Sequence, residues 1–230
     1  MSPAYAAPLS RGGHRPTGIV SSTTRDQTGE SIKLMLRGRC RYCDNSMPTR
    51  LPLTELATAA LFAATVVILG TDDRAELALG LTFCSMLVIV TVTDLERRVI
   101  PNVVLYAGAV VVLTIVATTD ASGLATRTIA AATAGGFMFL VALVYPPGMG
   151  MGDVKLAAVM GLYLGRAVAP ALLIGFAAGA LVGAAMMARH GAEVRKQAVP
   201  FGPFLALGGA AALWYGNAIL DWYLHTFLQG

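Results

Sequence analysis

Long uninterrupted runs of apolar residues dominate this chain of 230 residues and restrict what it can fold into. A helix that crosses a bilayer needs about 20 such residues. Inside a bilayer the backbone can satisfy its hydrogen bonds only as a helix or a closed barrel. Charged residues make up only 13% of the chain, against about 25% in a typical soluble domain. These features predict an all-α, polytopic membrane protein with six to seven transmembrane helices.

The limits of the apolar runs define the expected spans. They cover residues 52–70, 75–94, 101–119, 128–145, 151–166, 168–188 and 200–222. The segment 151–166 is short for a span. It is either a short, partly embedded helix or one arm of a hairpin with 168–188, and this choice separates a count of six from a count of seven.

Polar segments precede the first span. Residues 1–30 are rich in Ser, Thr, Pro, Gly and Arg, which predicts a disordered tail. Residues 31–51 form a cytoplasmic segment with a Cys-x-x-Cys pair, and residues 52–230 form the transmembrane domain. With the tail in the cytoplasm, 14 of the 17 Lys and Arg residues lie on the cytoplasmic side, as the positive-inside rule requires. The net charge of +4 therefore indicates membrane orientation and not binding to nucleic acid.

Two aspartates stand at the cytoplasmic ends of predicted spans. Asp94 ends the second span, and Asp153 begins the fifth after a glycine-rich stretch that lets the backbone approach a ligand. Two carboxyl groups brought together can share one proton, so that one acts as general base for a water molecule and the other as general acid. A helix N-terminus stabilises an ionised carboxylate, which favours Asp153 as the base. Alone, either could be an ordinary helix-end residue, as Asp72, Asp73 and Asp120 are expected to be.

Four segments occur in the order that is found in one protein family. They are LRGRCRYC (36–43), DLERRVIPN (94–102), GMGDVKL (150–156) and VPFGPFLALG (199–208). In this set the chain resembles the type IV prepilin peptidases, whose GxGD motif matches Gly150 to Asp153. The resemblance covers residues 36–208 and identifies the chain as a short form that lacks the complete N-terminal zinc and methyltransferase domain.

The resemblance implies an intramembrane aspartyl endopeptidase with Asp94 and Asp153 as its catalytic pair. The residues that it implies as substrate-binding or site-supporting are Pro101, Gly150, Gly152, Lys155, Pro200 and Gly202. Such an enzyme cleaves a basic leader peptide from prepilin-like or pseudopilin-like substrates at the cytoplasmic face of the bacterial cytoplasmic membrane, for type IV pili or protein secretion. The alternative is a catalytically silent relative, or a small transporter coupled to ions or protons, because carboxylates in spans also serve transport.

Cys40 and Cys43 are the candidate metal ligands of the chain. A closed zinc site needs four ligands, so this pair is half a site, and two chains would have to share a zinc ion. Cys84 lies within an apolar run and is expected to be a packing residue. We expect no cofactor for proteolysis and no methyltransferase activity, because the resemblance links methylation to the missing region. The oligomeric state is left open.

Overall fold

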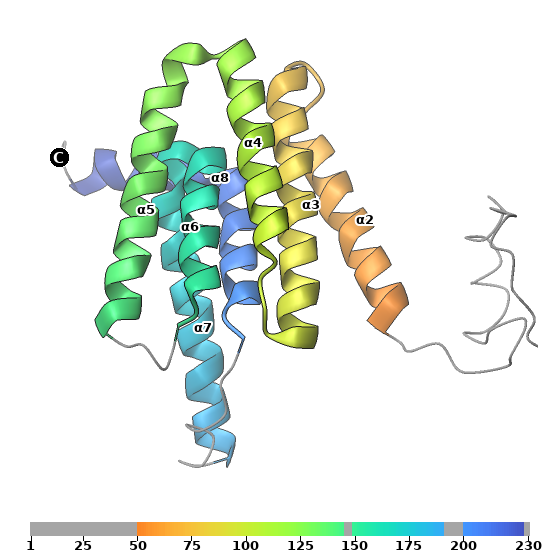
Figure 1. The fold of residues 1–230 in the computed structure, drawn as a ribbon, viewed down its shortest axis with the longest axis vertical. Coiled ribbons are helices and arrows are strands. Elements are labelled where there is room, and N and C mark those ends of the chain that lie inside the picture. The colour runs from red at the N-terminus through yellow and green to blue at the C-terminus, as the bar shows by residue number, and fades with distance from the viewer. Residues whose placement is uncertain (1–49, 145–148, 191–199, 228–230) are drawn as a thin grey trace, which may run out of the picture. The chain divides into compact units, whose positions relative to one another are not determined.

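The computed structural model describes residues 50–144, 149–190 and 200–227, and these ranges contain helices and no strand (Figure 1). The helices are α2 (Arg50–Leu69), α3 (Arg74–Arg97), α4 (Asn102–Thr119), α5 (Leu124–Val144), α6 (Met151–Leu164), α7 (Val168–His190) and α8 (Gly202–Phe227), with the short turns η1 (Ala121–Gly123) and η3 (Gly165–Ala167). The predicted all-α fold is confirmed. The predicted tail (1–30) and the cysteine segment up to residue 49 lie outside the described residues.

Six stretches of the described residues are long and apolar enough to cross a membrane, as expected for a polytopic membrane protein. Five of them correspond to α2, α3, α4, α5 and α8, and the remaining one, Met151–Arg189, joins α6 and α7 through η3. Figure 1 shows the chain rising through α6 and returning through α7, so these helices form a hairpin, which is one of the two expected alternatives. The turn between them requires Gly165, whose φ of 56° favours glycine.

Helix α6 is shorter than a full span. Its 14 residues cover about 21 Å, against about 30 Å for the hydrocarbon core of a bilayer. Side chains on neighbouring helices form hydrogen bonds near the C-terminal end of α6. The Arg127 guanidinium on α5 donates to the carbonyl oxygens of Leu162 and Tyr163. The Tyr163 hydroxyl donates to the Gly108 carbonyl oxygen on α4 (2.9 Å). A helix end inside a membrane is tolerated only beside such protein partners.

The interior of the bundle lies where α3, α6 and α8 meet. Gly209 on α8 faces both other helices, since a Cβ atom there would lie 2.9 Å from Met160 Cε on α6 and 3.2 Å from Phe83 Cζ on α3. Met160, Phe83 and Leu205, one turn before Gly209, are all completely buried. Close packing of these side chains fixes the three helices relative to one another.

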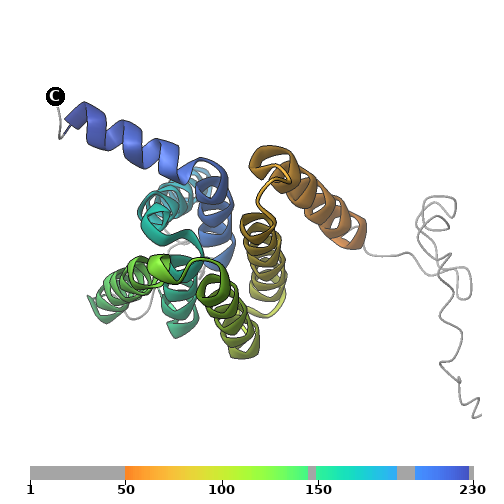
Figure 2. The same ribbon diagram turned by 90° about the horizontal axis from the view of Figure 1, so that it is seen from above.

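This packing brings several helix ends to one end of the bundle. Helix α3 ends there, and α4, α6 and α8 begin there (Figure 1, lower end). Figure 2 views the same bundle from above and shows α2 at its periphery, beside α3. Asp94 and Asp153 both lie at this shared end.

Candidate active site

Asp94 lies in the last turn of α3 and is buried, with 6% of its surface exposed. The helix ends at Arg98, which has a positive φ of 53° and donates its N–H to the Asp94 carbonyl oxygen (2.9 Å). The Asp94 side chain contacts α8, where its Oδ2 accepts a hydrogen bond from the Gly202 N–H (2.9 Å). Helix α3 therefore sets the position of this carboxyl group, and the beginning of α8 sets its orientation.

Asp153 lies in the first turn of α6 and is also buried, with 8% of its surface exposed. Its Oδ2 accepts a hydrogen bond from the Gly150 N–H (3.2 Å), and its own N–H donates to the Gly150 carbonyl oxygen (3.1 Å). The side chain thus caps the beginning of its own helix, where backbone N–H groups lack partners within the helix. Unlike Asp94, Asp153 is oriented by a local turn and not by a distant segment.

The two carboxyl groups line one cavity of about 270 Å³. In each, Oδ2 is held by a backbone N–H near the beginning of a helix, which leaves Oδ1 for a water molecule or a substrate. The other lining residues are Arg98, Val99, Ile100, Asn102, Gly150, Met151, Gly152 and Lys155. The cavity therefore joins the end of α3 to the beginnings of α4 and α6.

Three glycines near the carboxyl groups differ in how tightly they are enclosed. A Cβ atom on Gly202 would lie 2.6 Å from Asp94 Oδ2, and one on Gly152 would lie 3.0 Å from Ile100 Cβ. A Cβ atom on Gly150 would meet its nearest described neighbour at 3.5 Å, which is an ordinary contact. The steric need for glycine therefore decreases from Gly202 to Gly152 to Gly150.

The remaining predicted site residues take structural positions. Lys155 lines the cavity, but its Nζ donates to Asn102 Oδ1 (3.0 Å) and lies 5.9 Å from the centre of the Tyr106 ring. Lys155 therefore links α6 to α4. Pro101 immediately precedes α4, and Pro200 lies two residues before α8. Both prolines belong to the described residues, and neither is among those that line the cavity.

Asp73 and Asp120, two other aspartates at helix ends, are capping residues. Asp73 caps α3, with its Oδ1 accepting a hydrogen bond from the Ala75 N–H (2.8 Å). Asp120 accepts hydrogen bonds from the Ser122 hydroxyl (2.6 Å) and the Gly123 N–H (3.1 Å), and these two bonds hold the pKa of its carboxyl group below the usual value. Both aspartates are exposed, as expected from the sequence. Asp94 and Asp153 therefore differ from these two capping residues in being buried.

Within the described ranges, no group of three or more His, Cys, Asp or Glu residues could hold a metal ion. Cys40 and Cys43 lie outside those ranges, so the half-site for zinc stays a prediction. Cys84 is buried, and its Sγ lies 3.3 Å from Thr65 Oγ1 on α2. This position agrees with the packing role expected for Cys84.

Sequence reasoning did not select Arg98 or Asn102 as site residues, although both line the cavity. A signal was present, because both belong to the segment 94–102 that carries the first aspartate motif. The hydrogen bond between Gly202 and Asp94 is different. It joins residues 108 positions apart, and no spacing in the sequence indicates it.

Two family profiles match the chain. The profile described as the type IV leader peptidase family matches residues 81–186, which include Asp94 and Asp153. The profile described as the bacterial peptidase A24 N-terminal domain matches residues 33–69. This second match extends beyond the cysteine motif and includes the whole of α2.

Several similar proteins carry the name prepilin leader peptidase/N-methyltransferase. The protein from Bacillus subtilis (strain 168) is 34% identical over 202 residues, which cover 85% of this chain and 78% of that protein. The protein from Burkholderia pseudomallei (strain 1026b) is 36% identical over 197 residues, covering 80% and 60%. The protein from Aeromonas hydrophila is 35% identical over 209 residues, covering 85% and 68%. No solved structure is significantly similar to this chain.

Proposed function

This chain belongs to the type IV leader peptidase family, and from that premise we propose that Asp94 and Asp153 are its catalytic pair. As a member of the family the chain is a membrane peptidase. The proposed reaction is hydrolysis of the peptide bond between a basic leader and the apolar helix of a prepilin-like or pseudopilin-like substrate. The observation that supports it best is that these two buried carboxyl groups line one cavity.

The proposed chemistry needs one carboxylate and one carboxylic acid. The carboxylate removes a proton from a water molecule, which attacks the carbonyl carbon of the scissile bond, and the acid protonates the leaving nitrogen. Two neighbouring carboxyl groups do not both ionise readily, so they hold one proton between them. Hydrogen bonds from Gly150 and Gly202 keep both groups oriented while the proton moves.

The helix dipoles do not decide which aspartate begins as the base. Asp153 lies at the beginning of α6. That position is the reason why the sequence favours Asp153 as the base. Asp94, however, accepts its hydrogen bond from the beginning of α8 although it lies near the end of α3. Both carboxyl groups therefore contact a helix N-terminus, which removes the expected difference. We propose that the pair acts as one titrating unit.

The proposed active site faces the cytoplasm. Helix ends on the same side of the bundle as the cavity carry Arg97, Arg98, Lys155 and Arg189, and the opposite ends carry Arg74, Arg127 and Arg166. Arg127 is engaged with carbonyl groups of α6, which weakens its role as an orienting charge. This difference follows the positive-inside rule.

Cysteine labelling in intact cells tests the orientation. In a chain whose native cysteines have been replaced, a membrane-impermeant maleimide added outside should label a cysteine at position 120 and not one at position 98. Permeabilised cells should show labelling at both positions. Labelling at position 98 in intact cells would put the cavity on the outer side.

Amide substitution tests the catalytic pair. Asp94→Asn and Asp153→Asn should each lower cleavage of a test substrate by at least about a thousandfold, because each removes one partner of the acid–base pair. The test substrate has a basic leader, a glycine and an apolar helix, and leader release is followed on gels in membranes. Asp73→Asn and Asp120→Asn, at exposed capping positions, should cleave like the parent. Near-parental cleavage by either Asp94→Asn or Asp153→Asn would exclude the aspartyl mechanism.

Neither a transport function nor a methyltransferase is proposed. The buried aspartates lie at helix ends, whereas ion pathways in transporters place carboxylates near the middle of the membrane. The chain spans 60% of the length of the Burkholderia relative and 68% of the Aeromonas relative. The methyltransferase part of their name is therefore not extended to this chain, and no zinc ion is assigned to the proteolytic step.

A further inference from the structure

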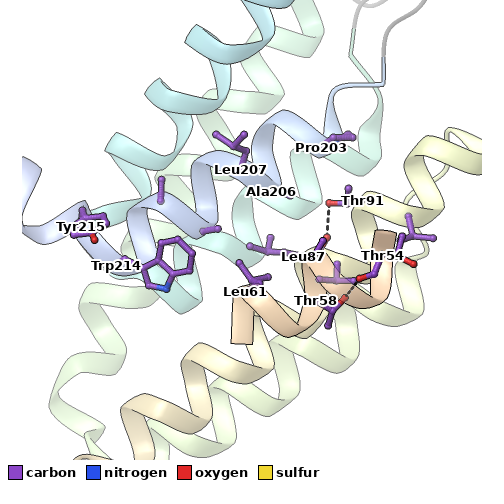
Figure 3. Close-up of a pocket in the computed structure, with 15 residues that line it drawn as sticks. Thr54, Thr58, Leu61, Leu87, Thr91, Pro203, Ala206, Leu207, Trp214 and Tyr215 are labelled. Atoms are coloured by element: carbon purple, nitrogen blue, oxygen red, sulfur yellow. Dashed lines mark hydrogen bonds between the residues drawn. The ribbon is translucent and has the colours of Figure 1, made fainter. Parts of the chain in front are cut away.

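A groove of about 530 Å³ lies between α2, α3 and α8 (Figure 3). Its lining is almost wholly apolar, and two of its threonines bond to their own helices. Thr58 donates to the Thr54 carbonyl oxygen and Thr91 to the Leu87 carbonyl oxygen, each at 2.7 Å. These hydroxyl groups are therefore not available to a ligand as donors, and the groove favours an apolar one.

One end of the groove adjoins the proposed catalytic pair. Thr91 lies one turn before Asp94 on the same side of α3. Pro203 follows Gly202, whose N–H holds Asp94. From Pro203 to Tyr215 the lining runs along α8 for about 18 Å, which corresponds to about 12 residues of a bound helix. A helix in this groove would have one end at the carboxyl groups.

Helix α2 is held against α3 and α8 at the far end of the groove. Its Thr65 is completely buried, contacts Cys84 on α3 (3.3 Å) and accepts a hydrogen bond from Trp214 Nε1 on α8 (3.2 Å). At the beginning of α2, Leu53 and Leu56 are 67% and 68% exposed. The contacts of Thr65 therefore fix α2 as one wall of the groove.

We propose that this groove binds the apolar helix of the substrate, with the N-terminal end of that helix at Asp94. The proposal rests on the proposed function and adds where the membrane segment of the substrate lies. Small side chains favour a helix over an acyl chain as the ligand, because they let a second helix backbone approach closely. The small lining residues are Ala57, Ala206, Ala210 and Ala211.

The position of the scissile bond supports the same ligand. In the proposed reaction this bond lies at the boundary between the leader and the apolar helix. A helix seated along α8 with one end at Asp94 presents that boundary to the cavity of 270 Å³. The leader would then extend away from the membrane on the side of α3, α6 and α8 where these helix ends meet.

Photocross-linking in membranes tests where the substrate binds without requiring turnover. The full chain with Asp94→Asn carries a photoreactive amino acid at position 207 on α8, where Leu207 lines the groove and is 56% exposed. The matched control carries it at position 140 on α5, where Leu140 is 60% exposed and does not line the groove. The probe is the same test substrate, with its basic leader, glycine and apolar helix.

We expect cross-links from position 207 to the apolar helix of the test substrate at about ten times the yield from position 140, the ratio that a preference of about 1.4 kcal/mol gives. Equal yields at the two positions would refute the proposal. So would cross-links from position 207 that join only lipid or a second copy of this chain.

A substitution that fills the groove provides a second test. Ala211→Phe should lower cleavage of the test substrate by about tenfold or more, because an overpacked groove excludes the substrate helix. The matched control is Ala132→Phe, at an exposed position of α5, and it should cleave like the parent. If the Ala211→Phe protein fails to fold, the cross-linking result alone decides, since it needs no change in packing.

The two proposals can fail separately. Parental cleavage by a folded Ala211→Phe protein, together with loss of cleavage in Asp94→Asn, would refute the groove and leave the catalytic pair in place. Cleavage by Asp94→Asn would instead refute the catalytic pair, whatever the cross-links show.

Discussion

Replacement of Gly202 by alanine tests how the Asp94 carboxyl group is held. The added Cβ atom would lie 2.6 Å from Asp94 Oδ2 and 3.0 Å from Asp94 Cγ. The first of these distances is about 0.8 Å inside the 3.4 Å at which ordinary contacts begin. The carboxyl group must therefore move by nearly that amount, and the hydrogen bond of 2.9 Å from the Gly202 N–H is stretched or lost.

The size of the effect follows from this displacement. Moving a reacting group by about 1 Å lowers the rate about a hundredfold, so we expect Gly202→Ala to lower cleavage by about that factor. Stability should change less. Alanine gains up to about 1 kcal/mol of helix propensity over glycine at the start of α8, which offsets part of the cost of a lost hydrogen bond, about 1.5–3 kcal/mol for a charged acceptor.

Initial rates of leader release by purified protein in lipid nanodiscs would measure the effect, with thermal unfolding recorded on the same samples. Gly136→Ala is the matched control, because a Cβ atom there meets nothing within 4 Å. Gly150→Ala should remain within a few-fold of the parent, since its added atom makes only ordinary contacts with described residues. The reasoning fails if Gly202→Ala cleaves at nearly the parental rate, or if Gly136→Ala loses as much activity.

Three further predictions concern other parts of the chain. The double variant Cys40→Ser and Cys43→Ser should cleave within a few-fold of the parent. Metal analysis of the purified parent protein should find well under one zinc ion per chain. One tightly held zinc ion per chain, together with lost cleavage in the double variant, would contradict this prediction. Gly161→Ala should lower the free energy of unfolding by about 1–3 kcal/mol, because the added Cβ atom would lie 2.6 Å from backbone atoms of α5. Gly183→Ala is the control and should leave the free energy of unfolding unchanged, because a Cβ atom there meets nothing within 4 Å. Asp120→Asn should lower thermal stability at neutral pH but not in acid. The pKa of the Asp120 carboxyl group is lower in the folded chain than in the unfolded chain. Its ionised form therefore stabilises the fold above the unfolded-state pKa, and this contribution is lost as the pH falls through the folded-state pKa.

The fold class follows from the sequence because a bilayer leaves the backbone few choices. Each apolar run had to become a helix that satisfies its own backbone, and each of the seven expected segments corresponds to one of the helices α2 to α8. The helix boundaries were less predictable, because capping residues and turns set them. Helix α5, for example, begins at Leu124 and not at 128, because η1 and the Asp120 cap lead directly into it. The length of α6 depends on Arg127, which satisfies its last carbonyl groups from another helix.

The candidate site, like the fold, could be predicted from the sequence only in part. Asp94 and Asp153 could be selected from the sequence because each stands at the end of an apolar run within a short motif, and such patterns are local. Only the tertiary structure decided that the Gly202 N–H orients Asp94 and that a groove lined by α2, α3 and α8 begins beside it. These features depend on which side chains and backbone atoms meet when α3, α6 and α8 pack together. Packing of this kind joins residues more than 100 positions apart, and no periodicity along the chain records it.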